Sequence, residues 1–357
     1  MKKAKFAKQL LVATSTVMAL GVGSALAEEM PLKNRSIAYV LTNDHWATFA
    51  TADGKLECPD GVNDGPREEY AKLFPNDGKV RRIQDTELKR EAEIWFPALS
   101  SDDGIPFKES KSKVAKGLNL DGKIGPNDYE SPEGEKGIDN QFNRALGCVD
   151  AYRPGNALYD LHNRYMQFFN WGRMLIEITN VDNLTNDDDV TVTLYKARDP
   201  MLTDGTGNEY LPYGTQRIDE RWGKKFTSVS HGKIVNGVLT TDGADMRFTH
   251  NYYFDDFGIA LIKGAKFKLN VLPDQANGIV AGYVDIESFI RMENGGLGSH
   301  SSSYGRQAMA ANYRALYRVA DGYPDANGKN TAVSGAKELT FKQVYIKRAE
   351  KRVAEAK

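Results

Sequence analysis

The sequence contains few of the residues that mark metal and redox sites. Its 357 residues include two cysteines and five histidines. Two cysteines are too few for a disulfide-rich mini-protein or a multi-cysteine metal domain. No histidines have the HxH or HExxH spacing of a local metal site. The chain also has no GxSxG, Walker, GxGxxG or CxxCH motif, so no familiar catalytic or cofactor-binding spacing is present.

An excess of charge of one sign is missing as well. The 47 Lys and Arg residues nearly balance the 48 Asp and Glu residues, giving a formal net charge of −1. This balance provides no electrostatic footprint for nucleic acid, so we expect no nucleic-acid partner. With 41% hydrophobic and 10% aromatic residues, the chain has enough apolar mass to fold into a globular protein rather than remain disordered.

The first 27 residues have the layout of a secretory signal peptide. Four lysines lie within the first eight residues, and the apolar run Leu10–Ala27 follows and ends in Ala-Leu-Ala. Thr, Ser and Gly within the run make it a poor membrane span, and no later run reaches 18 apolar residues. We therefore predict a periplasmic or secreted protein with no membrane span in the mature chain. Removing the leader's four lysines changes the formal net charge from −1 to −5.

Both cysteines, Cys58 and Cys148, follow the predicted signal peptide. In an oxidising compartment such an isolated pair is expected to form one disulfide. Two buried free thiols, or one reactive thiol, are the alternatives. A disulfide would close a loop of about 90 residues and, in the chain-entropy model, would stabilise the folded protein by about 4 kcal/mol.

The remaining chain divides into a loop-rich portion and a β-rich portion. Residues 28–150 are irregular, with short helices, whereas residues 151–346 contain short β-rich runs separated by turns; residues 347–357 form a charged tail. We predict strands over residues 174–179, 190–196, 237–241, 245–254, 258–262, 265–271, 278–291 and 339–346, and a helix over residues 305–320. Because almost no helices separate the strands, we predict a mainly β protein, an antiparallel β-sandwich or jelly roll.

Several strings within residues 55–150 resemble those of a family of exported proteobacterial proteins of unassigned activity. They are Glu57–Gly61 (ECPDG), Glu91–Pro97 (EAEIWFP), Gly117–Lys123 (GLNLDGK), and Glu133–Gln141 (EGEKGIDNQ) running into Gly147-Cys148. The resemblance implies export and one family-long unit. It implies no catalytic residue and no substrate.

A Gly-punctuated loop after residue 117 suggests a calcium site. Its oxygen-bearing side chains are Asn119, Asp121, Asn127 and Asp128, with further acids, including Asp139, close behind. Calcium takes several oxygen ligands from a flexible backbone, although the spacing is not that of an EF-hand. The alternative is a solvated acidic loop braced by Asx turns. The acidic run 186–189 is a weaker second candidate.

Two strand segments carry residues that could act on a polysaccharide. If residues 278–291 form a strand, Asp285 and Glu287 share one face about 7 Å apart, within the range that glycoside hydrolysis uses. The polar outer face of an ordinary strand is the alternative. Arg247–Tyr253 could supply the groups of a lyase, but strand alternation places its Arg and His on opposite faces.

Aromatic side chains could form a ligand platform. Trp171 and Trp222 lie near predicted loops or strand ends, and Tyr283 lies beside the acid pair. Aromatic rings suit the apolar faces of sugars and similar ligands; filling the core is the alternative.

Taken together, these patterns predict an exported, non-catalytic binding or accessory protein, stabilised by calcium. Its expected partner is a small molecule, a glycan or an envelope protein. A polysaccharide hydrolase or lyase on a β-sandwich is the alternative, and a structural component of an envelope complex is the second alternative.

Overall fold

A computed structural model of the chain describes residues 32, 34–48, 58, 61–63, 107–155, 160–169, 172–249, 259–293 and 309–348. Contacts divide the chain into Met1–Pro31 and Leu32–Lys357, and all described residues belong to the second unit. The predicted signal peptide and Trp171 lie outside the described residues, as does the tail from residue 349.

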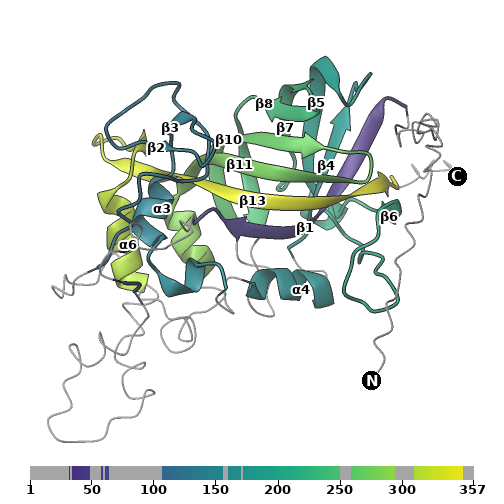
Figure 1. The fold of residues 1–357 in the computed structure, drawn as a ribbon. Coiled ribbons are helices and arrows are strands. Elements are labelled where there is room, and N and C mark those ends of the chain that lie inside the picture. Colours follow the sequence, from purple (N-terminus) through teal and green to yellow (C-terminus); the bar gives the residue numbers. More distant parts are fainter. Residues whose placement is uncertain are drawn as a thin grey trace, which may run out of the picture. The chain divides into compact units, whose positions relative to one another are not determined.

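The core of the fold is an antiparallel sheet that closes on itself (Figure 1). Its eight strands pair in chain order, and the last pairs with the first. They are β1 (Ser36–Trp46), β4 (Met174–Thr179), β5 (Asn186–Lys196), β7 (Ser228–Val235), β8 (Val238–Thr241), β10 (Ile259–Val271), β11 (Gln275–Asp285) and β13 (Asn330–Ile346). The mainly β prediction is confirmed. The sandwich prediction gives way to a closed barrel, because pairing between β1 and β13 leaves one continuous sheet rather than two.

Short strands, helices and 3-10 turns lie outside the eight barrel strands. β9 (Ala244–Thr249) pairs with β10, while β6 (Gly214–Gln216) and β12 (Gly322–Pro324) pair with β13, and β2 (Tyr129–Glu130) pairs separately with β3 (Lys136–Ile138). The helices are α3 (Gln141–Leu146), α4 (Leu161–Phe169), residues 286–293 and α6 (Met309–Arg318), with 3-10 turns η2 (Asp150–Tyr152) and η3 (Glu220–Trp222). Within the described residues, no helix is long and apolar enough to cross a membrane.

Strand alternation fills the barrel interior with apolar side chains. In β5, Val190, Val192 and Leu194 are buried in the main core, whereas the intervening threonines are only partly buried. In β1 the odd-numbered Tyr39 and Leu41 belong to that core. An irregularity between Leu41 and Asn43 shifts the register, so the even-numbered Trp46 also joins the core.

The outer face of β11 and β13 is covered by the segment that precedes β2. Leu118 and Leu120 pack against a small apolar cluster formed by Ala47, Ala281 and Ala336. Figure 1 shows β2, β3, α3 and α6 gathered at one end of β13. This covering layer forms one wall of the cavity described next.

Candidate functional site

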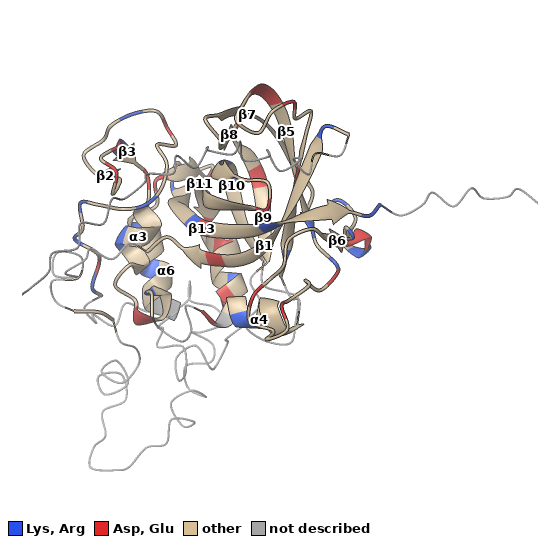
Figure 2. Ribbon diagram, turned by 45° about the vertical axis from the view of Figure 1, so that its right-hand side comes forward, with Lys and Arg blue, Asp and Glu red and all other residues tan. Residues whose placement is uncertain are grey.

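A polar cavity of about 340 Å³ lies where the segment around β2 and β3 meets β11 and the turn after α6. Figure 2 shows both acidic and basic residues on the ribbon in this region. The polar side chains that line the cavity are Asp121, Asn127, Asp128, Asp139, Gln141, Arg144, Tyr283, Arg318 and Asp321. Asp139 and Gln141 are its buried members, 7% and 5% exposed, whereas Asp121 and Asp321 are exposed.

Asp139 follows β3 directly and is held by the backbone of the covering segment. Its Oδ2 accepts hydrogen bonds from the N–H groups of Leu120 at 2.7 Å and Asp121 at 3.4 Å. Burial is the main cause that raises the pKa of Asp139 to about 6, and the Leu120 N–H acts in the opposite direction. The negative charges of Asp128 and Asp121 raise this pKa further.

The loop itself is shaped by side-chain to backbone hydrogen bonds. Asn119 Oδ1 accepts the N–H of Gly122 at 2.7 Å, and Asp121 Oδ1 accepts the N–H of Lys123 at 2.8 Å. Asp128 Oδ2 accepts the N–H of Gly125. The Asp121–Lys123 bond is an Asx turn, the alternative to a calcium loop, and the other two bonds brace the same loop.

Asp321 and Tyr283 contribute the opposite side of the cavity. Asp321 Oδ1 accepts the N–H of Ser334 at 2.7 Å. Although the residue is exposed overall, partial desolvation of its carboxyl group raises the pKa of Asp321. Burial, followed by the nearby charges of Asp139 and Asp321, raises the pKa of Tyr283 to about 12.

The two arginines of the cavity wall are already engaged. Arg144 donates to the backbone oxygen of Asn127 at 2.7 Å and lies over the ring of Tyr129, 5.4 Å from its centroid. Arg318 forms an ion pair with Glu109 at 2.7 Å. Their guanidinium groups therefore do not neutralise the aspartates directly.

The structure places three of the four predicted calcium ligands on the cavity wall. Asp121, Asn127 and Asp128 line it, whereas Asn119 braces the adjacent turn. In the described part of the chain, no three His, Cys, Asp or Glu side chains lie close enough together to hold a metal ion. Calcium binding stays a prediction.

The second acidic run, residues 186–189, borders a separate open cavity of about 550 Å³ together with Arg35. Figure 2 shows this acidic band at the start of β5. Asp187 accepts backbone N–H groups of Asp182 at 2.7 Å and Asp189 at 3.2 Å. Burial opposes the shift, but these donors hold the pKa of Asp187 below its usual value. Its carboxylate therefore has a structural role in the turn.

The predicted acid pair is separated by a change of secondary structure. β11 ends at Asp285, whose Oδ1 accepts the N–H of Ser288 at 2.9 Å and caps the helix over residues 286–293. Its other oxygen forms an ion pair with Lys263 at 2.9 Å. Glu287 instead accepts hydrogen bonds from two α6 tyrosines at 2.9 and 2.8 Å. The prediction that both acids share one strand face is wrong, and neither lines the polar cavity.

The aromatic residues fall in different places. Tyr283 lines the cavity, whereas Trp222 packs against the main core and lies edge-on to Phe226, with centroids 5.5 Å apart. Lys196 Nζ lies 4.5 Å from the Trp222 ring centroid. In the proposed lyase segment, Arg247 is exposed on β9, and the residues after Thr249 lie outside the described residues.

A buried ionic cluster inside the barrel was missed by sequence reasoning. Asp44 forms an ion pair with Lys337, and its other carboxylate oxygen lies 3.1 Å from Nε2 of His162 of α4; all three side chains are at most 2% exposed. Asn163 of α4 also donates to the Asp44 backbone oxygen at 2.9 Å. No local motif marks this cluster, because its members are more than 100 residues apart. It fastens α4 to β1.

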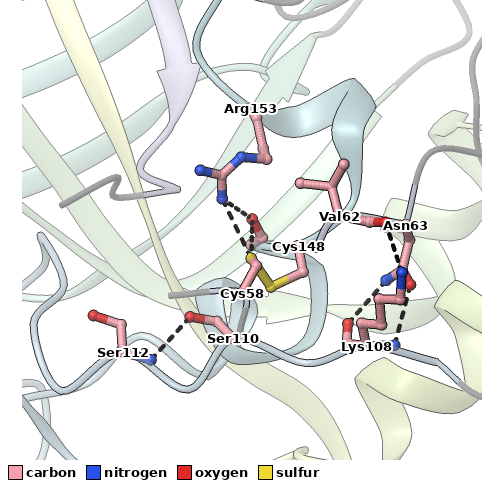
Figure 3. The surroundings of a disulfide bond; sticks show 9 residues. Cys58, Val62, Asn63, Lys108, Ser110, Ser112, Cys148 and Arg153 are labelled. Atoms are coloured by element: carbon pink, nitrogen blue, oxygen red, sulfur yellow. Dashed lines mark hydrogen bonds between the residues drawn. A yellow bond between two sulfur atoms is a disulfide. The ribbon is translucent and has the colours of Figure 1, made fainter. Parts of the chain in front are cut away.

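Cys58 and Cys148 form a disulfide, which confirms the predicted pairing (Figure 3). It joins residue 58 to the junction between α3 and η2. Arg153 Nη1 donates to the Gly147 oxygen at 2.8 Å and contacts Cys58 Sγ at 3.5 Å. Nearby, Asn63 and Lys108 exchange hydrogen bonds of 2.8 and 3.1 Å. A disulfide is compatible with an extracytoplasmic protein.

Fold and site together define a closed antiparallel barrel with a filled interior and a polar cavity on its outer surface. Comparison of the chain with protein families, curated proteins and solved structures finds no match. Function is therefore argued from the geometry of this cavity.

Proposed function

We propose that the chain is an exported, non-catalytic protein that binds a small hydrophilic ligand in the polar cavity. The basic-then-apolar layout of residues 1–27 supports export, and so does the Cys58–Cys148 disulfide, since such bonds persist in oxidising compartments.

The observation that carries this proposal is the presence of buried polar side chains on the wall of a ligand-sized cavity. Its volume of about 340 Å³ lies within the range of small-molecule sites, roughly 300–1,000 Å³. Gln141 donates through Nε2 to the Asn127 oxygen, and Asp139 accepts through Oδ2. Within the described residues, Gln141 Oε1 and Asp139 Oδ1 accept no hydrogen bond, which leaves each available to a ligand.

A thermal-shift screen of the disulfide-bonded protein against amines, sugars, carboxylates and divalent metals tests this function. A ligand at 100 times its Kd stabilises the native state by about 2.7 kcal/mol, which gives a measurable rise in Tm. Replacing cavity-lining Ala320 by Phe should fill the cavity and abolish the response. Leu202→Phe, at an exposed site away from the cavity, is the control. A hit that survives Ala320→Phe would place binding elsewhere, and turnover of the ligand would contradict a non-catalytic role.

A further inference from the structure

The acids of the cavity lack the cationic partners that several other acids of the described structure have. Asp44, Asp285, Glu177 and Glu338 each form an ion pair with a Lys or Arg. Within the described part of the chain, no Lys, Arg or His forms an ion pair with a cavity aspartate: Asp121, Asp128, Asp139 or Asp321. These four acids are each paired with a cation, whereas, among the described residues, the four cavity aspartates are not.

The formal charge of the cavity wall is negative. Four aspartates and two arginines line it, a formal sum of −2 when all are ionised. Arg318 is paired with Glu109, which lies outside the lining, so its charge is compensated elsewhere. Arg144 is turned to the Asn127 backbone and the Tyr129 ring. The cavity wall therefore carries net negative charge, which attracts an incoming cation.

The spread of the acids favours an organic cation over a bare metal ion. Calcium requires six to eight oxygens at about 2.3–2.6 Å around one point, and the described side chains form no such group of three acids. An ammonium group instead donates separate hydrogen bonds of about 2.7–2.9 Å. A linear diamine carries two such groups, one for the buried Asp139 and one for an exposed acid of the same cavity wall. The Tyr283 ring on the wall offers a surface that also attracts cations.

We propose that the cavity binds a small organic dication of the linear diamine class, with one ammonium group at Asp139 and Gln141 and the other near Asp121 and Asp321. This inference rests on the proposed ligand-binding function and specifies its ligand. Gln141 supports it independently of the acids, because this 5%-exposed amide keeps its Oε1 acceptor for a donor in the cavity.

Isothermal titration calorimetry of the disulfide-bonded protein at neutral pH tests the inference with four matched probes. We expect 1,4-diaminobutane to bind, 1-aminobutane to bind at least about tenfold more weakly, and 1,4-butanediol and succinate to give no heat, since hydrogen bonds between charged groups are worth about 1.5–3 kcal/mol each. Binding of the diol or succinate with an affinity equal to the diamine's would overturn the charge assignment while leaving a ligand-binding cavity. Binding of CaCl₂ without the diamine would replace the dication by a metal. Heat from none of these probes, together with a flat thermal-shift screen, would reject the binding function as well.

Asp139→Asn and Glu133→Gln form the matched pair of variants. Glu133 is exposed on the same loop and does not line the cavity, so its variant should bind the diamine as the parent does. Asp139→Asn should weaken binding at least about tenfold, with an unchanged circular dichroism spectrum. Asp121→Asn, at an exposed position, provides a second test that does not disturb the buried wall. Unchanged diamine affinity in both aspartate variants would overturn the assignment.

Discussion

Asp139 is the residue at which stability and ligand binding oppose one another. Its carboxylate is buried, has no cationic partner among the described residues, and lies near Asp121 and Asp128. A buried, uncompensated charge destabilises the folded state. A residue that costs stability in the empty protein while facing a cavity is typical of a binding site.

We expect acid to relieve this cost. The pKa of Asp139 is raised from 3.8 to about 6 in the folded state, so the native protein binds more protons than the unfolded chain between those values. The penalty is absent below the unfolded pKa, grows as the pH rises, and is complete above about pH 6. Denaturant midpoints of the parent should rise relative to those of Asp139→Asn as the pH falls from about 7 to about 5. Parallel midpoints across this range would contradict the assigned shift.

For the buried Asp44 cluster we expect the opposite effect on stability: removing the charge of its carboxylate should destabilise the folded protein. Asp44→Asn leaves Lys337 uncompensated at 1% exposure, and removal of one partner of a buried pair costs about 3–5 kcal/mol. Glu135→Gln removes the exposed pair with Lys268 and should cost no more than about 1 kcal/mol. Urea denaturation of both variants measures the difference. Similar losses in the two would contradict a stabilising role for the buried pair between β1 and β13.

At the scale of elements, the short strand β3 depends on its central glycine. Gly137 has φ +80°, and a Cβ there would lie 2.5 Å from the Lys123 oxygen. Gly122 has φ +75° with no atom within 4 Å of such a Cβ. Gly122→Ala should therefore cost about 1–2 kcal/mol from backbone strain alone, and Gly137→Ala more, because the loop must move. Denaturation and diamine titration of both variants separate the effect of backbone strain from that of loop displacement. Equal effects in the two variants would show that the contact with the Lys123 oxygen does not matter.

Sequence patterns predicted many elements, but several boundaries differ: β10 is one strand where two were predicted, β13 begins at Asn330 rather than at residue 339, and β7 was not predicted. The helix predicted over residues 305–320 contains α6, and the alternating run 190–196 lies within β5. The strand predicted over residues 278–291 ends at Asp285, because that side chain caps the next helix through the Ser288 N–H. Residues 284–287 alternate apolar and polar, and this pattern fits both a strand that continues and a helix that begins after Asp285. Periodicity over so short a span could therefore not distinguish strand from helix.

The site was only partly predictable for a related reason. Asp121 and Asp128 stood out as acids in a Gly-punctuated loop. Arg318 ends α6 and Asp321 lies in the turn after it, about 200 residues away, and only the pairing of β13 with both β11 and β12 brings that turn beside the loop. Local sequence carries no record of such pairing. For the same reason, strand alternation could not distinguish a sandwich from a barrel, since both bury every second residue.

At the scale of the whole molecule, the disulfide joins residue 58 to the junction between α3 and η2, beside backbone hydrogen bonds that link Asn63 to Cys148 and Asp150. Reducing it, or replacing both cysteines by serine, should lower the free energy of unfolding by about 2–4 kcal/mol, measured by denaturation with and without dithiothreitol. Thiol labelling of the unreduced, denatured protein should find no free cysteine. Two labelled thiols, or identical midpoints under both conditions, would contradict this role.

The pairing of β1 with β13 also sets an order of events in time. Ala38 lies opposite Val344, so a chain growing from its N-terminus makes the first strand of the barrel long before its closing partner. Until the last strand arrives, β1 and β11 each present an open edge, and such edges recruit other chains. Contacts this distant along the sequence are also slow to form. The barrel therefore cannot close until β13, Asn330–Ile346, is available to pair with both of these edges.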